Sequence, residues 1–230
     1  LVVRVFLDAG QLRERQHGAA ALLGVTLAEG AAGRSDEELA RFFESRGARF
    51  AGGSGGAALR CLAVHAGDCL PVLRDVLLSP TVDAEAIERK RGELLSHLRA
   101  EEDDPALTGR RRLLAAVYGE HPLGRNGKGS PEALRALDRD TLLRHHTDFF
   151  VPGSAVLSLV GAFDVDHLEE LARRTFESWT PHATDFPRLP EVQLAGTSQS
   201  ILVPEDREQV HVYLGHLGVR RSVEDWEALL

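Results

Sequence analysis

Residues 17–30 read HGAAALLGVTLAEG, and the remainder of the chain is organised around this stretch. Two glycines bracket a run of alanine, leucine and valine, which predicts one short buried helix. Leu22 and Val25 belong to its apolar side, and the run holds almost no polar atoms. Taken alone, it is typical of a core helix that carries no chemistry.

Strand and helix signals alternate on both sides of this helix. Residues 1–9 form a β-branched strand pattern, and Ser35 to Glu38 form a capping box that opens another helix. Residues 48–65 contain GGSGG and predict two strands joined by or running through the glycines. Further helices are expected from Asp68, over 83–101, and from Asp104, Ser130, Asp140 and Asp166, with the clearest buried strand at 154–163.

Composition excludes several classes of function. The chain has 230 residues, 43% of them hydrophobic and 27% charged, which is typical of a globular protein. Its net charge of -8 argues against nucleic acid or an anionic membrane as partner, because both require a basic surface. No apolar run approaches the roughly 20 residues of a membrane span.

The ends and the region 181–198 indicate the domain organisation. Three prolines and no periodicity predict a linker over 181–198, between a first domain at 1–180 and the start of a second at 199–230. Strands are expected at 201–203 and 209–216 and a helix at 222–230. No signal peptide is visible at Leu1–Leu7, and both ends look cut, so we expect a fragment whose compartment, cytoplasmic or periplasmic, is undetermined.

Several stretches in order and spacing resemble the zinc peptidase family of insulinase, pitrilysin and mitochondrial processing peptidase, in its bacterial processing-peptidase-like branch. The resemblance implies an α+β fold: a processing-peptidase-like metallohydrolase domain with a curved mixed sheet and helices on one face, followed by the start of a second, similar domain. It also implies that four such domains pack into a closed chamber. The stretches are RSDEELARFFESRGARF (34–50), ERKRGELLSHLRAEEDDP (88–105), GEHPLGRNGKGSPEAL (119–134), VPGSAVLSLVGAFD (151–164) and REQVHVYLGHLGVRR (207–221).

The same resemblance identifies a degenerate zinc site. Active members carry H-x-x-E-H on the first helix, where two histidines one turn apart share a zinc ion and the glutamate acts as general base. Here these positions are Ala21, Gly24 and Val25, and the third ligand position falls at or beside His97. We therefore expect no catalytic residue, no bound metal and no cofactor in this chain, with zinc only in an active partner.

The glycines at 52–56 occupy the strand that pairs with an extended peptide in active relatives. Gly52, Gly53, Ser54, Gly55 and Gly56 are thus candidate peptide-binding residues, since their backbone can still form hydrogen bonds. The other interpretation is a plain hairpin turn, which glycine clusters mark more often.

The remaining polar clusters favour ordinary structural roles. Glu93, His97 and Glu101 share a helix face, for which a solvated polar surface is expected rather than a metal site. His145 and His146 point to different faces, with surface or capping roles, and His211 and His216 form no chelate. GRNGKGS lacks the phosphate-loop pattern, no serine or cysteine has a nucleophile context, and Cys61 is expected to be buried.

The preferred hypothesis is therefore an inactive zinc-peptidase-like subunit. It pairs as a heterodimer with an active homologue, or self-associates as a dimer, and helps form the peptide-binding chamber. Two alternatives stay open. One is a structural subunit of a larger complex without proteolytic role, and the other is an active zinc metalloendopeptidase with an unanticipated site.

Overall fold

The computed structural model describes residues 1–193, 198–204 and 208–218. These residues form two compact units, which are described separately. The first contains residues 1–98 and 127–189, and the second contains residues 99–126 and 190–230.

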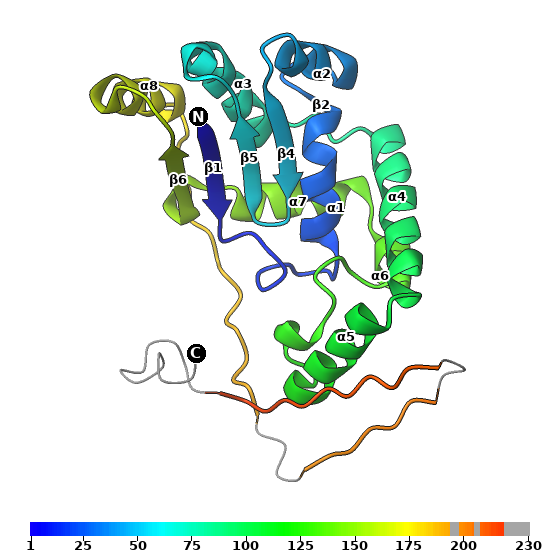
Figure 1. The fold of residues 1–230 in the computed structure, drawn as a ribbon. Coiled ribbons are helices and arrows are strands. Elements are labelled where there is room, and N and C mark those ends of the chain that lie inside the picture. Colours follow the sequence, from blue (N-terminus) through cyan, green and yellow to red (C-terminus); the bar gives the residue numbers. More distant parts are fainter. Residues whose placement is uncertain (194–197, 205–207, 219–230) are drawn as a thin grey trace. The chain divides into compact units, whose positions relative to one another are not determined.

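A four-stranded sheet is the centre of the first unit (Figure 1). Its order is β4-β5-β1-β6, and all three pairings are antiparallel. The expected α+β class is confirmed, but the sheet is antiparallel among the described strands and not mixed. The strands are β1 (Val2–Leu7), β4 (Arg49–Gly53), β5 (Gly56–Arg60) and β6 (Ala155–Val160), with a separate ladder of β2 (Gly30–Ala31) and β3 (Arg34–Ser35).

The helices occur along the chain in the order that the sequence predicts. The glycine run forms the turn that joins β4 to β5, so the two strands predicted around the glycines are present. In the first unit the helices are α1 (Ala19–Thr26), η1 (Leu27–Glu29), α2 (Asp36–Glu44), η2 (Ala63–His65), α3 (Ala66–Leu78), α4 (Ala84–Glu102, which continues into the second unit), α6 (Pro131–Ala136), α7 (Arg139–Phe149), η4 (Pro152–Ser154) and α8 (Val165–Phe176).

Side-chain caps fix where several helices begin. The capping box of α2 is present: the Ser35 hydroxyl accepts from the Glu38 amide, and the Glu38 carboxylate accepts from the Ser35 amide. The caps of α7 and α8 are Asp138 and Asp164, two residues earlier than predicted. In both cases two aspartates lie two residues apart, and the first one reaches the free amides of the opening turn.

Alternation along the strands separates a buried face from an open one. Val3, Val5 and Leu59 are buried on one face of the sheet, and Val5 also lines an apolar hollow between the sheet and α8.

 The volume of that hollow is about 700 Å³, and it is lined by Leu157, Leu159, Phe176 and their neighbours. Figure 1 shows α3 and α7 on the far side of the strands, so one face of the sheet carries the helices, as expected.

Strand β6 differs from its predicted environment. The sequence SAVLSLVGAF predicts the most buried strand, yet Val156 and Val160 are 62% and 64% exposed. The reason is position, because β6 is an edge strand and those two side chains lie on the open face of the sheet. An apolar run predicts a strand but not its place in the sheet.

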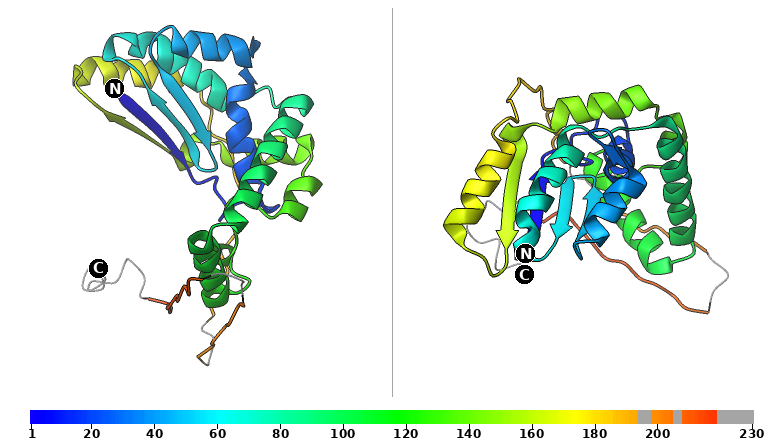
Figure 2. Two further views of the ribbon diagram at one scale, coloured as in Figure 1. Left: turned by 45° about the vertical axis from the view of Figure 1, so that its right-hand side comes forward. Right: turned by 90° about the horizontal axis from the view of Figure 1, so that it is seen from above.

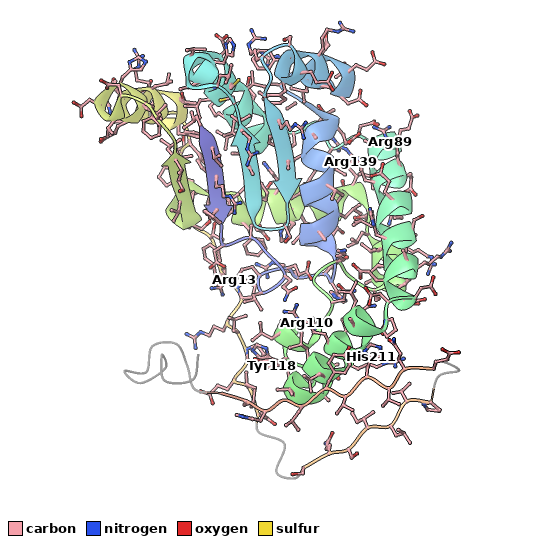
Figure 3. The ribbon with its side chains drawn as sticks, viewed as in Figure 1. Arg13, Arg89, Arg110, Tyr118, Arg139 and His211 are labelled. Atoms are coloured by element: carbon pink, nitrogen blue, oxygen red, sulfur yellow. The ribbon has the colours of Figure 1, made fainter. Side chains whose placement is uncertain are left out.

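The segment after α8 packs against the first unit as far as Leu189. Arg13, which is labelled in Figure 3, donates to the Pro187 carbonyl oxygen at 2.8 Å, and its guanidinium lies over the Phe186 ring. The Phe186 ring also contacts Phe149. The described residues of 181–198 contain no helix or strand, as predicted, while the domain boundaries stay a prediction.

The second unit contains helix α5 (Pro105–Tyr118), the short η3 (Pro122–Gly124) and an extended segment. Asp104 caps α5 as predicted, and Leu113, Leu114 and Val117 on this helix are half-buried. Residues 201–203 and 209–216 form no strands, contrary to the prediction. Tyr213 instead donates to the Pro105 carbonyl oxygen at 3.1 Å. The helix expected at 222–230 lies outside the described residues.

Candidate functional site

Helix α1 is fixed at the edge of the sheet by tight packing (Figure 2). The chain enters it through Gly18, whose φ of 88° is left-handed. Leu22 and Leu23 are fully buried, and the buried Thr26 hydroxyl donates to the Leu23 carbonyl oxygen at 2.8 Å. The helix packs against β4 on one side and α7 on another. The predicted buried helix is therefore present, and its role in the core is clear.

The contact between α1 and β4 is a backbone-to-backbone contact. A Cβ atom added at Gly24 would lie 2.6 Å from the Gly53 carbonyl oxygen and 2.8 Å from the Ser54 nitrogen. A Cβ at Gly52 would collide with the Gly24 carbonyl oxygen. Side chains at either position would force the helix and strand apart, so glycine at both positions allows the close approach.

This contact lies at the position where the sequence resemblance predicts the general base of active relatives. Gly24 is buried against the β4–β5 hairpin, and it has no side chain to hold a proton. Ala21 is buried and Val25 is half-buried, and neither carries a metal-ligating atom. The residues present do not fit a zinc ion at α1.

His97 lies on an exposed part of α4, with Glu93 on the same helix face. Glu93 pairs with Lys90 at 3.0 Å, and Glu101 lies 3.8 Å from Arg111. These ion pairs agree with the expected polar surface. Within residues 1–193, 198–204 and 208–218, no three His, Cys, Asp or Glu side chains are grouped to hold a metal ion.

Helix α4 is anchored to the end of η1 through Glu29. The Glu29 carboxylate pairs with Arg89, which is labelled in Figure 3, and with Lys90 at 3.1 Å. The buried Arg91 on the next position donates to the carbonyl oxygens of Leu134 and Leu137. These hydrogen bonds satisfy carbonyl oxygens at the end of α6 and hold α4 in place within the first unit.

The five candidate peptide-binding residues all lie in or beside the β4–β5 hairpin. Gly52 and Gly53 end the edge strand β4, Ser54 and Gly55 form the turn, and Gly56 begins β5. The Gly55 carbonyl oxygen accepts a hydrogen bond from the Leu7 amide at 2.9 Å. Among the described strands, no other strand pairs with the outer side of β4.

His145 is buried, contrary to the expected surface or capping role. Its Nε2 donates to the Ala9 carbonyl oxygen at 2.8 Å, and burial lowers the pKa of His145 to about 4. His146 is half-buried and bonds to the Leu77 carbonyl oxygen at 2.7 Å, and burial also lowers its pKa. The two rings do point to different faces, as predicted. Helical spacing is the sequence signal for this burial, because His145 lies three residues after the buried Leu142 and four before the buried Phe149.

The cysteines are buried and free, as expected for Cys61. Burial raises the pKa of the Cys69 thiol to about 12 and also raises that of Cys61. A thiol with a raised pKa is a poor nucleophile near neutral pH. His211 and His216 are exposed, and no metal-binding group includes them among the residues that the structure describes.

Comparison with known proteins gives related sequences. The family described as "Peptidase M16 inactive domain" matches residues 136–230. The chain is 30% identical over 174 residues to an uncharacterised zinc protease of Mycobacterium bovis, covering 73% of this chain and 39% of that protein. It is 27% identical to the mitochondrial-processing peptidase subunit beta of Bos taurus, covering 97% of this chain and 46% of that protein. The chain thus spans less than half the length of these relatives.

Solved structures show the same fold. A peptidase M16 inactive domain from Pseudomonas fluorescens superposes with a TM-score of 0.73 at 23% identity, covering 84% of this chain and 49% of that one. A protease from Helicobacter pylori gives a TM-score of 0.73 at 16% identity, covering 84% of this chain and 48% of that one. Together with the sequence matches, they show that this chain has the fold of M16 peptidases and that residues 136–230 match the family described as "Peptidase M16 inactive domain".

Proposed function

We propose that this chain is a peptidase-like subunit that does not cleave peptides itself. It pairs with a homologue that carries the zinc motif, and it helps to hold peptide in an extended form. The observation that carries the proposal is the direct backbone contact of Gly24 with the β4–β5 hairpin, at the position where the motif has its general base.

The chemistry of α1 supports the non-cleaving role. Cleavage by this family's mechanism needs two imidazoles to bind zinc and a carboxylate to accept a proton from the metal-bound water. Ala21, Gly24 and Val25 supply none of these groups. His97 alone would contribute a single ligand from the exposed surface of α4.

The position of β4 supports the peptide-holding role. An extended peptide binds to a sheet edge through main-chain hydrogen bonds, a mode that needs an unpaired strand and no particular side chain. Strand β4 is such an edge, and Ala51 on it is exposed. The residues Gly52–Gly56 would then shape the end of the peptide site.

Co-expression with an H-x-x-E-H-bearing relative from the same genome tests the pairing. We expect the two chains to copurify and the pair to degrade peptides faster than the partner alone. If they do not associate, and the partner degrades peptides equally well without this chain, the proposal is wrong. Self-association is measured in parallel by the mass of the isolated chain in solution.

Two other outcomes would favour the alternatives. Copurification with a membrane complex, with no effect on peptide turnover, would indicate a structural subunit. None of the described helices has the length and apolar content to cross a membrane. Stoichiometric zinc in the isolated chain, together with chelator-sensitive cleavage, would indicate an active peptidase with its site elsewhere.

A further inference from the structure

The face of the sheet opposite the helices carries three arginines. Arg49 on β4 lies directly opposite Arg60 on β5, and Arg60 lies opposite Val2 on β1. Residues directly opposite one another share a face, and so do residues two apart along a strand, so Arg4 belongs to the same face. This surface, called the open face below, also includes Ala51, Ala58, Phe6, Val156, Ser158 and Val160.

All three arginines are exposed, and none has an ion pair or side-chain hydrogen bond among the described residues. Other arginines of the first unit are paired, such as Arg34 with Asp75 and Arg46 with Asp68. The Cβ atoms of directly opposite residues lie about 5 Å apart, where two like charges destabilise the sheet. A bound anion would reverse that effect, because it would be attracted to both guanidinium groups.

The strand positions between the arginines carry small side chains. Ala51 and Ala58 are opposite one another, and Ala58 is opposite Arg4. Small side chains there leave room for a ligand to lie across the strands beside the arginines. Arginine binds carboxylates through two parallel hydrogen bonds, so a ligand with several carboxylates suits this arrangement.

An acidic polypeptide suits the open face better than a nucleic acid does. Single-stranded nucleic acids bind to aromatic side chains on which their bases stack, and Phe6 is the one aromatic strand residue on this face. The net charge of -8 would also repel a long phosphate backbone. A short peptide is less affected, because repulsion from distant charges is screened beyond about 10 Å.

We propose that the open face binds an acidic segment of an extended polypeptide through Arg4, Arg49 and Arg60. This inference rests on the proposed peptide-holding function and names the chemical class of the peptide. It does not depend on pairing with an active partner, so it is tested on the chain alone.

The probe is a fluorescent peptide of about ten residues in which Glu and Ala alternate, so that its carboxylates share one face of an extended strand. A matched Lys-Ala peptide is the control, and binding is measured by fluorescence anisotropy at low ionic strength. We expect the chain to bind the acidic peptide and not the basic one. Added salt should weaken binding, because exposed charge pairs are screened.

The decisive variant is Arg4→Glu, Arg49→Glu, Arg60→Glu. It should bind the acidic peptide about tenfold more weakly, since exposed ion pairs contribute little individually but three are lost. It should also gain affinity for the Lys-Ala peptide, because the charge of the open face is reversed, and circular dichroism should show an unchanged fold. A second variant, with threonine at all three positions, should lose affinity for the acidic peptide and should gain no affinity for the Lys-Ala peptide.

The control variant is Arg41→Glu, Arg99→Glu, Arg135→Glu, which makes the same change in net charge on exposed helical positions. It should bind the acidic peptide within about twofold of the unmodified chain. An equal loss in both triple variants, no binding of the acidic peptide, or tighter binding of a single-stranded oligonucleotide would each overturn the inference. None of these results would bear on copurification with an active partner, so failure here is distinct from failure of the pairing.

Discussion

Replacing Gly24 with alanine tests the backbone contact between α1 and β4. The new methyl group would lie 2.6 Å from the Gly53 carbonyl oxygen and 2.8 Å from the Ser54 nitrogen. Both neighbours are backbone atoms, so neither can move aside by a change of rotamer. The helix and the hairpin must therefore separate, or the helix must shift along the strand.

Two opposing effects decide the change in free energy of unfolding. Alanine in place of glycine in a helix interior stabilises it by about 1 kcal/mol. Overpacking a tight contact costs about 1–3 kcal/mol, and we take the upper end, about 3 kcal/mol, because the contact is with backbone. The net expectation is a loss of about 2 kcal/mol, which corresponds to a fall in Tm of about 6 °C for a domain of this size.

Thermal and urea unfolding, followed by circular dichroism, measure this change, and Gly92→Ala is the matched control. Gly92 is exposed within α4, and a Cβ there would meet no atom within 4 Å. That variant should be more stable by about 1 kcal/mol. If Gly24→Ala is as stable as Gly92→Ala, the close contact does not exist in solution and the reasoning is refuted.

Three further predictions follow from the site and the core. The triple change Ala21→His, Gly24→Glu, Val25→His should not produce stoichiometric zinc binding or cleavage, because the side chain at 24 collides with the hairpin. Metal analysis and a peptide-cleavage assay measure the two outcomes. Robust zinc-dependent cleavage would contradict the prediction. His145 has a folded pKa of about 4, below its unfolded value, so it contributes stability that is present above about pH 6.5 and is lost as the pH falls toward 4. The free energy of unfolding falls by about 3 kcal/mol over this pH range. The variant His145→Gln keeps a donor for the Ala9 carbonyl oxygen and should reduce the slope of stability against pH over the same range. An unchanged slope would show that His145 is not the cause. Ser35→Ala should destabilise the chain by about 1 kcal/mol in urea unfolding, with Ser45→Ala, at the other end of α2, as the comparison; equal effects would argue against the capping box.

Local sequence signals predicted most of the elements. The capping box at Ser35 and Glu38 involves residues three apart, so its pattern is readable directly from the sequence. The same holds for Asp104 before Pro105, and for the glycines that form the β4–β5 hairpin. Each of these features depends on short-range hydrogen bonds or backbone preference, which a single stretch of sequence specifies.

Features that depend on distant contacts were not predictable. Gly24 and Gly52 are 28 positions apart in the chain, and nothing in either stretch indicates that their backbones touch. The burial of His145 depends on Ala9, which precedes it by 136 residues. The exposure of Val156 depends on the order of the strands in the sheet, which no single strand encodes.

The contact between Gly24 and the hairpin also limits which mutational paths are open to this chain. A carboxylate at position 24 has no room until the strand has moved, and the strand has no reason to move until a larger residue arrives at 24. Single substitutions toward a metal site therefore lower stability before they can add any activity. A selection experiment for peptidase activity would have to begin with changes in the glycine hairpin, and only afterwards in the helix.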